Sequence, residues 1–390
     1  MRKITRMLAL LLCAMLLTSC GAGLSEGDQI VELFAVNVGK GDALIVRVDD
    51  AVCLIDTGKP YARGKVRSAL SAMNVTALDA VFLTHMDSDH VGGLEWLADD
   101  DLPVGAWYAP AYCTGVKEGK HPVVRTAGRR GQDVQWLRRG DTVSLGSGAL
   151  LRVLAPDRQF DDKDDNNSLV MMLETAQGRM LLTGDMELPE EAVLLSQGDD
   201  LSCDVLKAPN HGDDDTLSQA FAREAAAKVA VISTDSVEKP GTPDPGVVSR
   251  LMAAGSAVVV TQDAGLGLRL TLKGGEPAVA AVNIDAPRPS GIVVQSVVPG
   301  DDLVTLRNDG ADCDLTGWYL YSDRGGELYA FPDEYVLRAG QTVTIGTNTS
   351  DEDDYDLLWD DKKVIHKSKR DDIELFDGWG RIIDAMSNGY

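Results

Sequence analysis

The sequence predicts an α/β layered sandwich that is followed by a separate all-β sandwich. Residues 30–285 begin with strands in hairpin order and continue with strands that alternate with helices, which is typical of sheets covered by helices. After a Pro- and Gly-containing linker at residues 286–291, the helical period disappears and short strands are separated by Gly, Asp and Asn turns. The length of 390 residues is also more than a single hydrophobic core usually organises.

The first domain, residues 30–285, is expected to contain strands and helices in the following places. Strands are predicted where apolar and β-branched residues form short runs between turn residues, at residues 30–38, 43–48, 52–55, 78–84, 150–154, 169–173, 179–183, 205–208, 229–233 and 257–261. Helices are predicted where apolar residues recur at helical spacing, at residues 63–73, 188–196, 216–227 and 245–254.

The second domain, residues 292–390, is expected to consist of strands alone. They are predicted at residues 292–298, 303–306, 318–322, 335–337, 342–345, 373–375 and 382–384. Two acidic runs, 161–165 in the first domain and 351–356 in the second, are interpreted as solvated loops. Neither run has the spacing of an EF-hand calcium loop.

The first twenty residues are interpreted as an export signal. A basic start precedes an apolar run at residues 7–17 that is too short to span a bilayer. The run ends in Leu-Thr-Ser-Cys-Gly, which resembles the bacterial lipobox, so residues 1–20 would be a lipoprotein signal peptide and Cys20 the lipidated residue. Residues 21–29 would form a tether, and the protein would be exported and lipid-anchored on the outer face of the cytoplasmic membrane. A plain signal peptide with an incidental cysteine is the alternative.

Composition limits the kind of partner. The net charge of −24 disfavours non-specific attraction to phosphate backbones or anionic membranes, so a phosphate-bearing substrate needs a local cation. Four of the six cysteines remain beyond Cys20, without CxxC spacing, so a thiolate metal site is not expected. Sequence does not choose between their three possible disulfide pairings, although Cys53 and Cys203 fit buried free thiols within strands.

The strongest functional signal is a cluster of metal-competent side chains directly after a predicted strand. His85, Asp87, Asp89 and His90 fall within six residues. If the chain stays extended, His85, Asp87 and Asp89 point to one side, and the two glycines that follow permit the turn that His90 needs. Carboxylates and imidazoles this close together are costly to bury without a cation. We therefore predict a metal site, with a solvated His- and Asp-rich loop as the alternative.

Two further candidates lie at the ends of later strands. Asp185 is preceded by Gly and His211 is followed by Gly, and strand ends are where α/β sheets present ligands. Taken singly, Asp185 would fit a turn residue and His211 a satisfied polar group. Together with the cluster at residues 85–90, both are predicted as metal ligands. Asp89 and Asp87 are the candidate catalytic residues.

These residues resemble a known family. The segment from His85 to His90 is similar to the His-x-His-x-Asp-His signature of metallo-β-lactamase-fold hydrolases, and more closely to the ComEC competence-protein variant, in which Asp stands at the position of Asp87. The agreeing stretches, in chain order, are residues 37–43, 54–58, 166–170, 181–185 and 204–212.

The resemblance implies an αββα sandwich and a role for several residues. Asp185 would be a carboxylate that bridges two metal ions, and His211 would supply the last imidazole. Asp56, Asn167 and Lys207 would support the ligands from outside. Two divalent ions would activate a hydroxide for hydrolysis, and the oxygen-rich ligand set favours manganese or mixed occupancy over two zinc ions.

The sequence also departs from the family pattern. Asn210 stands before His211 where a second histidine is often found, and three aspartates follow, whose charge would repel phosphate. Against that, residues 105–158 carry nine Lys or Arg and four acidic residues. Either a solvated loop or contact with a phosphate backbone explains this strip. Its candidate substrate-binding residues are Arg125, Arg129, Arg130, Trp136, Arg138 and Arg139.

The C-terminal region has its own resemblance. Stretches at residues 304–308, 315–320, 337–340 and 373–377 resemble a lamin-tail domain, which is an immunoglobulin-like sandwich. The resemblance implies a binding role, with a surface or a nucleic acid as the partner. Trp318 is expected in its core.

Three functions are consistent with these patterns. The first is an exported metal-dependent phosphodiesterase or nuclease that acts on DNA or another phosphodiester. The second is a hydrolase of a non-nucleic ester, amide or lactone, which the acidic composition favours. The third is a binding protein with a degenerate metal site, suggested by Asn210 and by the absence of a histidine near residue 167.

Overall fold

The computed structural model describes residues 29–114, 116, 120–160, 163–283, 291–322, 324, 327–361, 364–378 and 382–389. The predicted signal peptide with Cys20, most of the tether and nearly all of the predicted linker lie outside these residues. Within the described part of the chain, no helix is long and apolar enough to cross a membrane.

The first sheet of the N-terminal domain joins the beginning and the end of that domain. Its antiparallel half contains the hairpin strands, and β3, β4, β5 and β6 continue it in parallel. The strand order is β15 (Glu276–Val282), β14 (Gly267–Lys273), β1 (Val31–Val36), β2 (Leu44–Val48), β3 (Ala51–Ile55), β4 (Leu78–Phe82), β5 (Val104–Pro110) and β6 (Val134–Leu137).

The second sheet has the same mixed character. The strands β10 to β13 run parallel, whereas β7 to β10 pair antiparallel. The strand order is β13 (Ala257–Val260), β12 (Val229–Ile232), β11 (Val205–Lys207), β10 (Gly178–Leu182), β9 (Val170–Thr175), β8 (Ala149–Ala155) and β7 (Thr142–Leu145).

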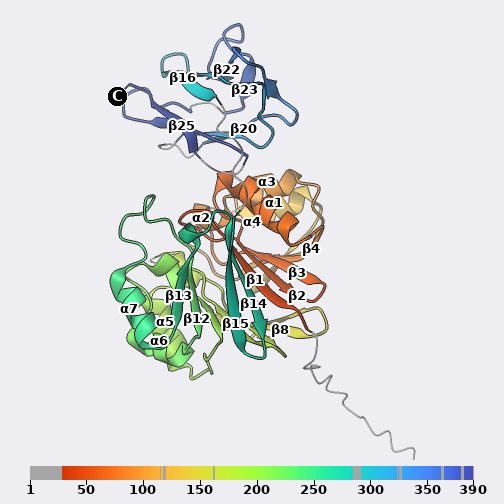
Figure 1. Ribbon diagram of the computed structural model, residues 1–390, viewed down its shortest axis with the longest axis vertical. Helices are drawn as coiled ribbons and strands as arrows, with labels where there is room; N and C mark the ends of the chain where they lie inside the picture. The colour runs from red at the N-terminus through yellow and green to blue at the C-terminus, as the bar shows by residue number, and fades with distance from the viewer. Residues whose placement is uncertain are drawn as a thin grey trace, which may run out of the picture.

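The two sheets pack face to face and helices cover their outer faces (Figure 1). Strand β1 shows why, because Leu33 and Ala35 lie in the core between the sheets, whereas Phe34 and Val36 lie under the helices. The first sheet is covered by α1 (Arg63–Ala72), α3 (Leu94–Asp99) and α4 (Pro122–Arg129), and the second by α5 (Leu188–Ser196), α6 (Gln219–Ala225) and α7 (Pro245–Ala253). The predicted αββα sandwich is confirmed.

The sequence prediction missed several elements of this domain. Strands β5, β6, β7, β14 and β15 and the helices α3 and α4 were not predicted. Edge strand β15 shows the reason, because its apolar run follows a proline and contains three alanines, and both residue types are uncommon in strands. The four cysteines within the described residues are all free, and Cys53 and Cys203 are buried as expected.

In the part of the C-terminal domain that the structure describes, every helix or strand is a strand, as predicted, and the strands form a β-sandwich around one core that includes Trp318. Two four-stranded sheets make up most of it, in the orders β16-β17-β22-β23 and β20-β19-β24-β25, with a short β18-β21 pair. The strands are β16 (Ile292–Val298), β17 (Leu303–Asn308), β18 (Cys313–Asp314), β19 (Tyr319–Ser322), β20 (Leu328–Ala330), β21 (Val336–Leu337), β22 (Thr342–Thr347), β23 (Leu357–Trp359), β24 (Asp372–Phe376) and β25 (Ile382–Ser387).

Candidate metal centre

The predicted metal ligands converge at one end of the N-terminal domain. His85 lies three residues beyond the end of β4, Asp185 three residues beyond β10 and His211 four residues beyond β11. His90 lies in α2 (Ser88–Val91), a single helical turn. The carboxyl ends of these parallel strands meet at the same edge of the sandwich, which is where such sheets hold ligands.

The path of the chain between His85 and His90 differs from the extended path that we expected. The direction of the Asp89 side chain is not set by the alternation of side chains along a strand, because α2 already starts at Ser88, with Asp87 as its N-cap residue. The helical turn brings His90 inward, and the two following glycines permit it. A Cβ on Gly93 would lie 2.4 Å from the backbone oxygen of Thr57.

Four buried residues form one half of the cluster, which we call the buried side. The carboxylate Oδ2 of Asp185 lies 2.9 Å from His211 Nε2 and 3.2 Å from His90 Nε2. The two imidazole Nε2 atoms are 3.2 Å apart, and one carboxylate oxygen of Asp42 completes a group of ligand atoms that all lie within 4.8 Å of one another. The sequence prediction missed Asp42.

Each imidazole of the buried side is oriented by a partner at its other nitrogen. His90 donates from Nδ1 to Asp56 at 2.8 Å, and His211 donates from Nδ1 to the backbone oxygen of Ser233 at 2.8 Å. Asp56 is itself held by the backbone N–H and the hydroxyl of Thr84. Such partners fix the tautomer, so both Nε2 atoms are left to act as ligands.

The residues Asp56 and Lys207 lie where the sequence prediction puts them, behind the ligands. The ammonium group of Lys207 is buried and lies 2.7 Å from Asp42 Oδ2. Burying a cation and an anion is tolerated when they are paired, so this pair helps to hold Asp42 beside the two imidazoles.

His211 reaches the cluster through an unusual backbone conformation. Asn210 and His211 both have positive φ, at 40° and 54°, within the short turn η3 (Pro209–Gly212). Non-glycine residues in this region cost of order 1–3 kcal/mol each and occur where the surrounding structure imposes them, often at functional sites. The backbone N–H of Asn210 bonds the carbonyl of Gly184, which ties this turn to the one that carries Asp185.

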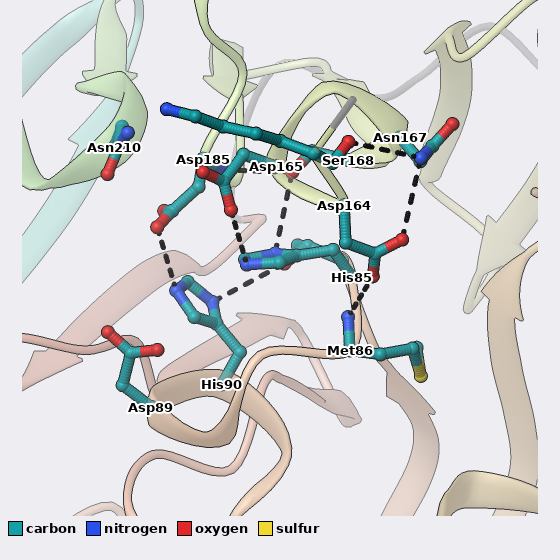
Figure 2. A network of polar contacts seen from close by, with 12 residues as sticks. His85, Met86, Asp89, His90, Asp164, Asp165, Asn167, Ser168, Asp185 and Asn210 are labelled. Atoms are coloured by element: carbon teal, nitrogen blue, oxygen red, sulfur yellow. Dashed lines mark hydrogen bonds and ion pairs between the residues drawn. The ribbon is translucent and has the colours of Figure 1, made fainter. Parts of the chain in front are cut away.

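The other half of the cluster, which we call the outer side, shares Asp185. Ligand atoms of His85, Asp165 and Asp185 all lie within 4.8 Å of one another, and His85 Nε2 is 3.7 Å from Asp165 Oδ1. His85 Nδ1 faces the hydroxyls of Thr84 at 3.1 Å and Ser168 at 3.4 Å. Figure 2 shows His85 and His90 side by side, with the carboxylates of Asp165 and Asp185 on the same side of both rings.

Asp165 corrects the prediction that the acidic run 161–165 is a solvated loop. Its side chain is only 19% exposed because η2 (Asp165–Asn167) turns it toward His85. The neighbouring Asp164 is buried and accepts a hydrogen bond from the backbone N–H of Met86 at 2.8 Å. Asn167, expected behind the ligands, bonds Phe160 and Thr114 instead, so it braces this loop rather than a ligand.

The two candidate catalytic aspartates lie at the mouth of the cluster. Asp89 Oδ2 is 3.7 Å from His211 Nε2 and 3.0 Å from the ammonium group of Lys40. Asp87 is exposed, and neither group of convergent ligand atoms contains it. Asp165 takes the place beside His85 that the sequence prediction gave to Asp87, because α2 begins there and turns the Asp87 side chain outward.

The cluster fits divalent cations. Three buried atoms at its centre, His85 Nε2, Asp185 Oδ1 and Asp42 Oδ1, have no hydrogen-bond partner among the described residues. Unsatisfied buried nitrogen and carboxylate oxygen atoms that converge on the same space are costly unless a cation binds them. Imidazole and carboxylate ligands suit zinc, and the carboxylate-rich outer side also suits manganese.

The pKa values of His90 and Asp165 are both raised, so the metal-free cluster tends to bind protons. Burial alone would lower the pKa of His90, but the carboxylates of Asp185 and Asp56 raise it well above its ordinary value. Burial, with the negative charges of Asp185 and Asp87, raises the pKa of Asp165 to about 7. Protons therefore occupy positions that a divalent cation would compete for.

Several arginines of the basic strip at residues 105–158 bond groups of their own domain. The guanidinium group of Arg130 donates to three backbone carbonyls, one within α3 and two just after it. The guanidinium group of Arg139 donates to Asp199 and to a backbone carbonyl. Arg125 and Arg129 both lie beside Glu95. We therefore assign Arg130 and Arg139 a structural role in place of the predicted substrate contact. Trp136 is 45% exposed, and Arg138 bonds Asp141 through its backbone.

The sequence contained signals for the missed residues. Asp42 belongs to the stretch at residues 37–43 that agrees with the family, and Asp165 directly precedes the agreeing stretch at residues 166–170. Both carboxylates lie beside motifs already aligned with the family. Lys40, in the same turn as Asp42, is the cation nearest to Asp89 among the described residues.

Comparison with known proteins agrees with this geometry. The family model of the metallo-beta-lactamase superfamily matches residues 36–236, and that of the Lamin Tail Domain matches residues 285–389. ComE operon protein 3 of Bacillus subtilis is 28% identical over 54% of this chain and 28% of its own length. Competence protein ComA of Neisseria gonorrhoeae is 27% identical over 59% of this chain and 30% of its own length. The chain thus spans less than a third of either relative.

Among solved structures, the metallo-beta-lactamase fold protein YhfI from Bacillus subtilis is 14% identical, with a TM-score of 0.42, over 63% of this chain and all of that protein. The superfamily model spans just over half of the 390 residues, including the strands and turns that carry the cluster. The chain belongs to the metallo-beta-lactamase superfamily.

Proposed function

We propose that the protein is an exported metal-dependent phosphodiesterase that cleaves DNA or a related phosphodiester. The observation that carries this proposal is the position of Asp185, whose carboxylate is shared by the buried side and the outer side. A shared carboxylate flanked by two ligand sets is the arrangement that holds two divalent ions.

His90, His211 and Asp42 would hold one zinc or manganese ion with Asp185, and His85 and Asp165 would hold the second. Such a pair of ions supplies Lewis acidity and an activated water for hydrolysis. The protein residues fix the ligands in advance, because Asp56 and the Ser233 carbonyl hold the imidazoles. Burial would raise the pKa of Asp89, at the mouth, but His90, His211 and Lys40 lower it, so Asp89 is ionised and can accept a hydrogen bond that orients a water molecule.

An anionic substrate is favoured by Lys40. Its ammonium group lies at the mouth, where the surface is otherwise rich in carboxylates, and it meets the condition that a local cation must hold a phosphate. The name of one relative, Competence protein ComA, makes DNA the first substrate to test.

A second function has one observation in its favour. Asp213, Asp214 and Asp215 follow η3 directly, and Asp215 lies 3.3 Å from Lys163, so only part of this charge is balanced. This acidic rim favours a neutral ester, amide or lactone as substrate, because it would repel a phosphate.

Export and lipid anchoring form part of the same proposal and rest on the signal and lipobox pattern at residues 1–20. Labelling of cells with a palmitate analogue would mark the unaltered protein, and Cys20→Ser would abolish the label. A labelled Cys20→Ser protein would contradict anchoring at this residue.

The central experiment measures metal content and activity on the same sample. Protein lacking residues 1–20 should bind about two metals per chain and should nick supercoiled plasmid and hydrolyse bis-p-nitrophenyl phosphate with Mn²⁺. Asp89→Asn should abolish this activity and keep the metals bound by the other residues. Asp354→Asn, an exposed carboxylate in the C-terminal domain, is the matched control and should change neither property.

Turnover of lactones or nitrocefin without cleavage of either phosphodiester would favour the second function. Two bound metals without turnover of any of these substrates would contradict both, and a chain that binds no metal would support a binding protein with a degenerate site.

A further inference from the structure

The C-terminal domain contacts the N-terminal domain beside the metal centre. The ring of Tyr61, in η1 (Pro60–Ala62), stacks on the ring of Phe376 with centroids 4.3 Å apart and planes 10° apart. Tyr321 of the C-terminal domain meets the same ring edge-on at 5.9 Å. In Figure 1 the C-terminal domain, in blue, accordingly lies at the end of the sandwich that carries α1 and α2.

Tyr61 connects this contact to a partly exposed charge cluster around Glu238. Its hydroxyl donates to Glu238 Oε1 at 3.3 Å, and the other carboxylate oxygen, Oε2, accepts the backbone N–H of Lys40 at 2.7 Å. Lys59 also pairs with this carboxylate. Burial lowers the pKa of Lys59 to about 8. Glu238 thus holds the turn that contains Lys40 from one side.

The turn has little freedom at this point. Gly39 has a φ of +80°, and a Cβ there would lie 2.4 Å from Glu238 Oε2. One residue further, Lys40 directs its ammonium group to Asp89 at 3.0 Å, and Asp42 donates its backbone N–H to the carbonyl of Asp89. The position of Lys40 is therefore set by Glu238 on one side and by the metal-centre loop on the other.

A cavity of about 360 Å³ lies beside these aromatic contacts. It is lined by Val38 and Gly39 of the turn, by Tyr61, and by Glu374 and Phe376 of the C-terminal domain. The stack of Phe376 on Tyr61 therefore lies next to the turn that contains Lys40.

We propose that the C-terminal domain positions Lys40 at the mouth of the metal centre, through Phe376, Tyr61 and Glu238, so that Lys40 contacts the anionic group of the substrate. The claim that Lys40 contacts a substrate anion rests on the proposed function. The claim that the C-terminal domain positions Lys40 concerns only contacts within this chain. Phe376, Tyr61 and Glu238 are positioning residues in this scheme. The C-terminal domain is then part of the substrate site as well as a binding module.

The first test needs no catalysis. Lysine modification by an amine-reactive reagent, read by mass spectrometry, should show faster labelling of Lys40 in Phe376→Ala than in the unaltered protein. Exposed Lys273 serves as the internal reference in the same digest. Val336→Ala, a change at an exposed position of the same domain, should leave Lys40 labelling unchanged. Equal labelling of Lys40 in Phe376→Ala and the unaltered protein would overturn the inference.

The second test uses the metal-loaded protein. Lys40→Met should raise KM for the phosphodiester, and weaken the binding of inorganic phosphate measured by calorimetry, by about tenfold or more, because it removes a charged hydrogen bond. Phe376→Ala should also raise KM, by a smaller factor, with kcat and metal content unchanged. Phe376→Tyr should have the KM of the unaltered protein. Phe376→Ala should add nothing further in a Lys40→Met background.

The variant Tyr61→Phe separates the ring from its hydroxyl, since it keeps the stack on Phe376 and removes the bond to Glu238. We expect an intermediate rise in KM and in Lys40 labelling. A Phe376→Ala protein that loses metal and kcat but keeps KM would contradict positioning, because it would indicate a general loss of structure. An unaltered protein without phosphate binding or turnover would refute the proposed function, whereas Lys40 labelling would still decide whether the C-terminal domain positions Lys40.

Discussion

The two sides of the metal centre are built differently although they share Asp185. On the buried side every ligand residue is at most 3% exposed, and partners outside the ligand set fix both imidazoles. On the outer side the side chain of Asp165 is 19% exposed and comes from the short turn η2.

This difference predicts two metal ions of unequal affinity. Ligands that are fixed before the metal arrives lose little freedom on binding, and imidazole-rich sites suit zinc. A partly exposed carboxylate is hydrated when no ion is bound, so it gains less free energy from binding the ion. We expect a tightly held ion on the buried side and a weaker, exchangeable ion on the outer side.

The largest effect should come from the residue that both sides share. Asp185→Asn should lose both ions and reduce turnover by roughly a thousandfold or more, since neither the ions nor the hydroxide they activate are then held. His211→Ala should lose the tight ion, and Asp165→Asn only the weak one. Metal analysis after dialysis measures this, and equal losses in Asp165→Asn and Asp185→Asn would contradict the comparison.

A smaller effect is expected behind the buried side. Asp56→Asn keeps the shape of the side chain but weakens its hold on His90 Nδ1, and changes of this kind typically cost 10- to 100-fold in metal affinity. Competition with a fluorescent chelator measures the affinity of the tight ion. A loss of affinity for the weak ion alone would contradict this prediction, because it would show that Asp56 supports the outer side and not the buried side.

The outer side should respond to pH in a distinct range. The pKa of Asp165 is about 7, so below pH 7 a proton competes with the weak ion, and its affinity should fall by up to about tenfold per unit as pH decreases. Above pH 7 the affinity should level off. In Asp165→Asn the affinity for the weak ion should no longer depend on pH in this range. Calorimetric titration with the metal between pH 5 and 8 measures this affinity. An unchanged slope in that variant would assign the proton to another group.

The smallest effect is expected away from both sides. Arg129→Ala removes an exposed ion pair with Glu95, so stability should change by less than about 1 kcal/mol and metal content not at all. Thermal unfolding and plasmid nicking check this. A large loss of nicking with intact metal content would restore the basic strip as a substrate surface.

The sequence predicted the sandwich because several of its central strands are continuous apolar runs, as in β3 and β12. Edge strand β15 was missed because its apolar run follows a proline and is rich in alanine, and both residue types are uncommon in strands. The cluster at His85 to His90 was predicted because its residue types are improbable in a core. Asp42 was missed because an aspartate in a turn is common, and Asp165 was missed because an acidic run is usually a solvated loop. Only their proximity to the histidines in three dimensions identifies them as ligands.

The contact between Phe376 and Tyr61 lies beyond sequence reasoning for a related reason. Each aromatic residue fits its own domain, and no spacing rule relates positions 315 residues apart across a linker. The same holds for Glu238, whose partner Lys40 lies 198 residues away in the chain.

Crystals of the protein soaked in manganese and measured at the metal absorption edge would test the shared-carboxylate centre most directly. The structure predicts two anomalous peaks, one on each side of Asp185, with the peak beside His90 and His211 retained at low metal concentration. A single peak that Asp185 does not touch, or no peak within this cluster, would contradict the account.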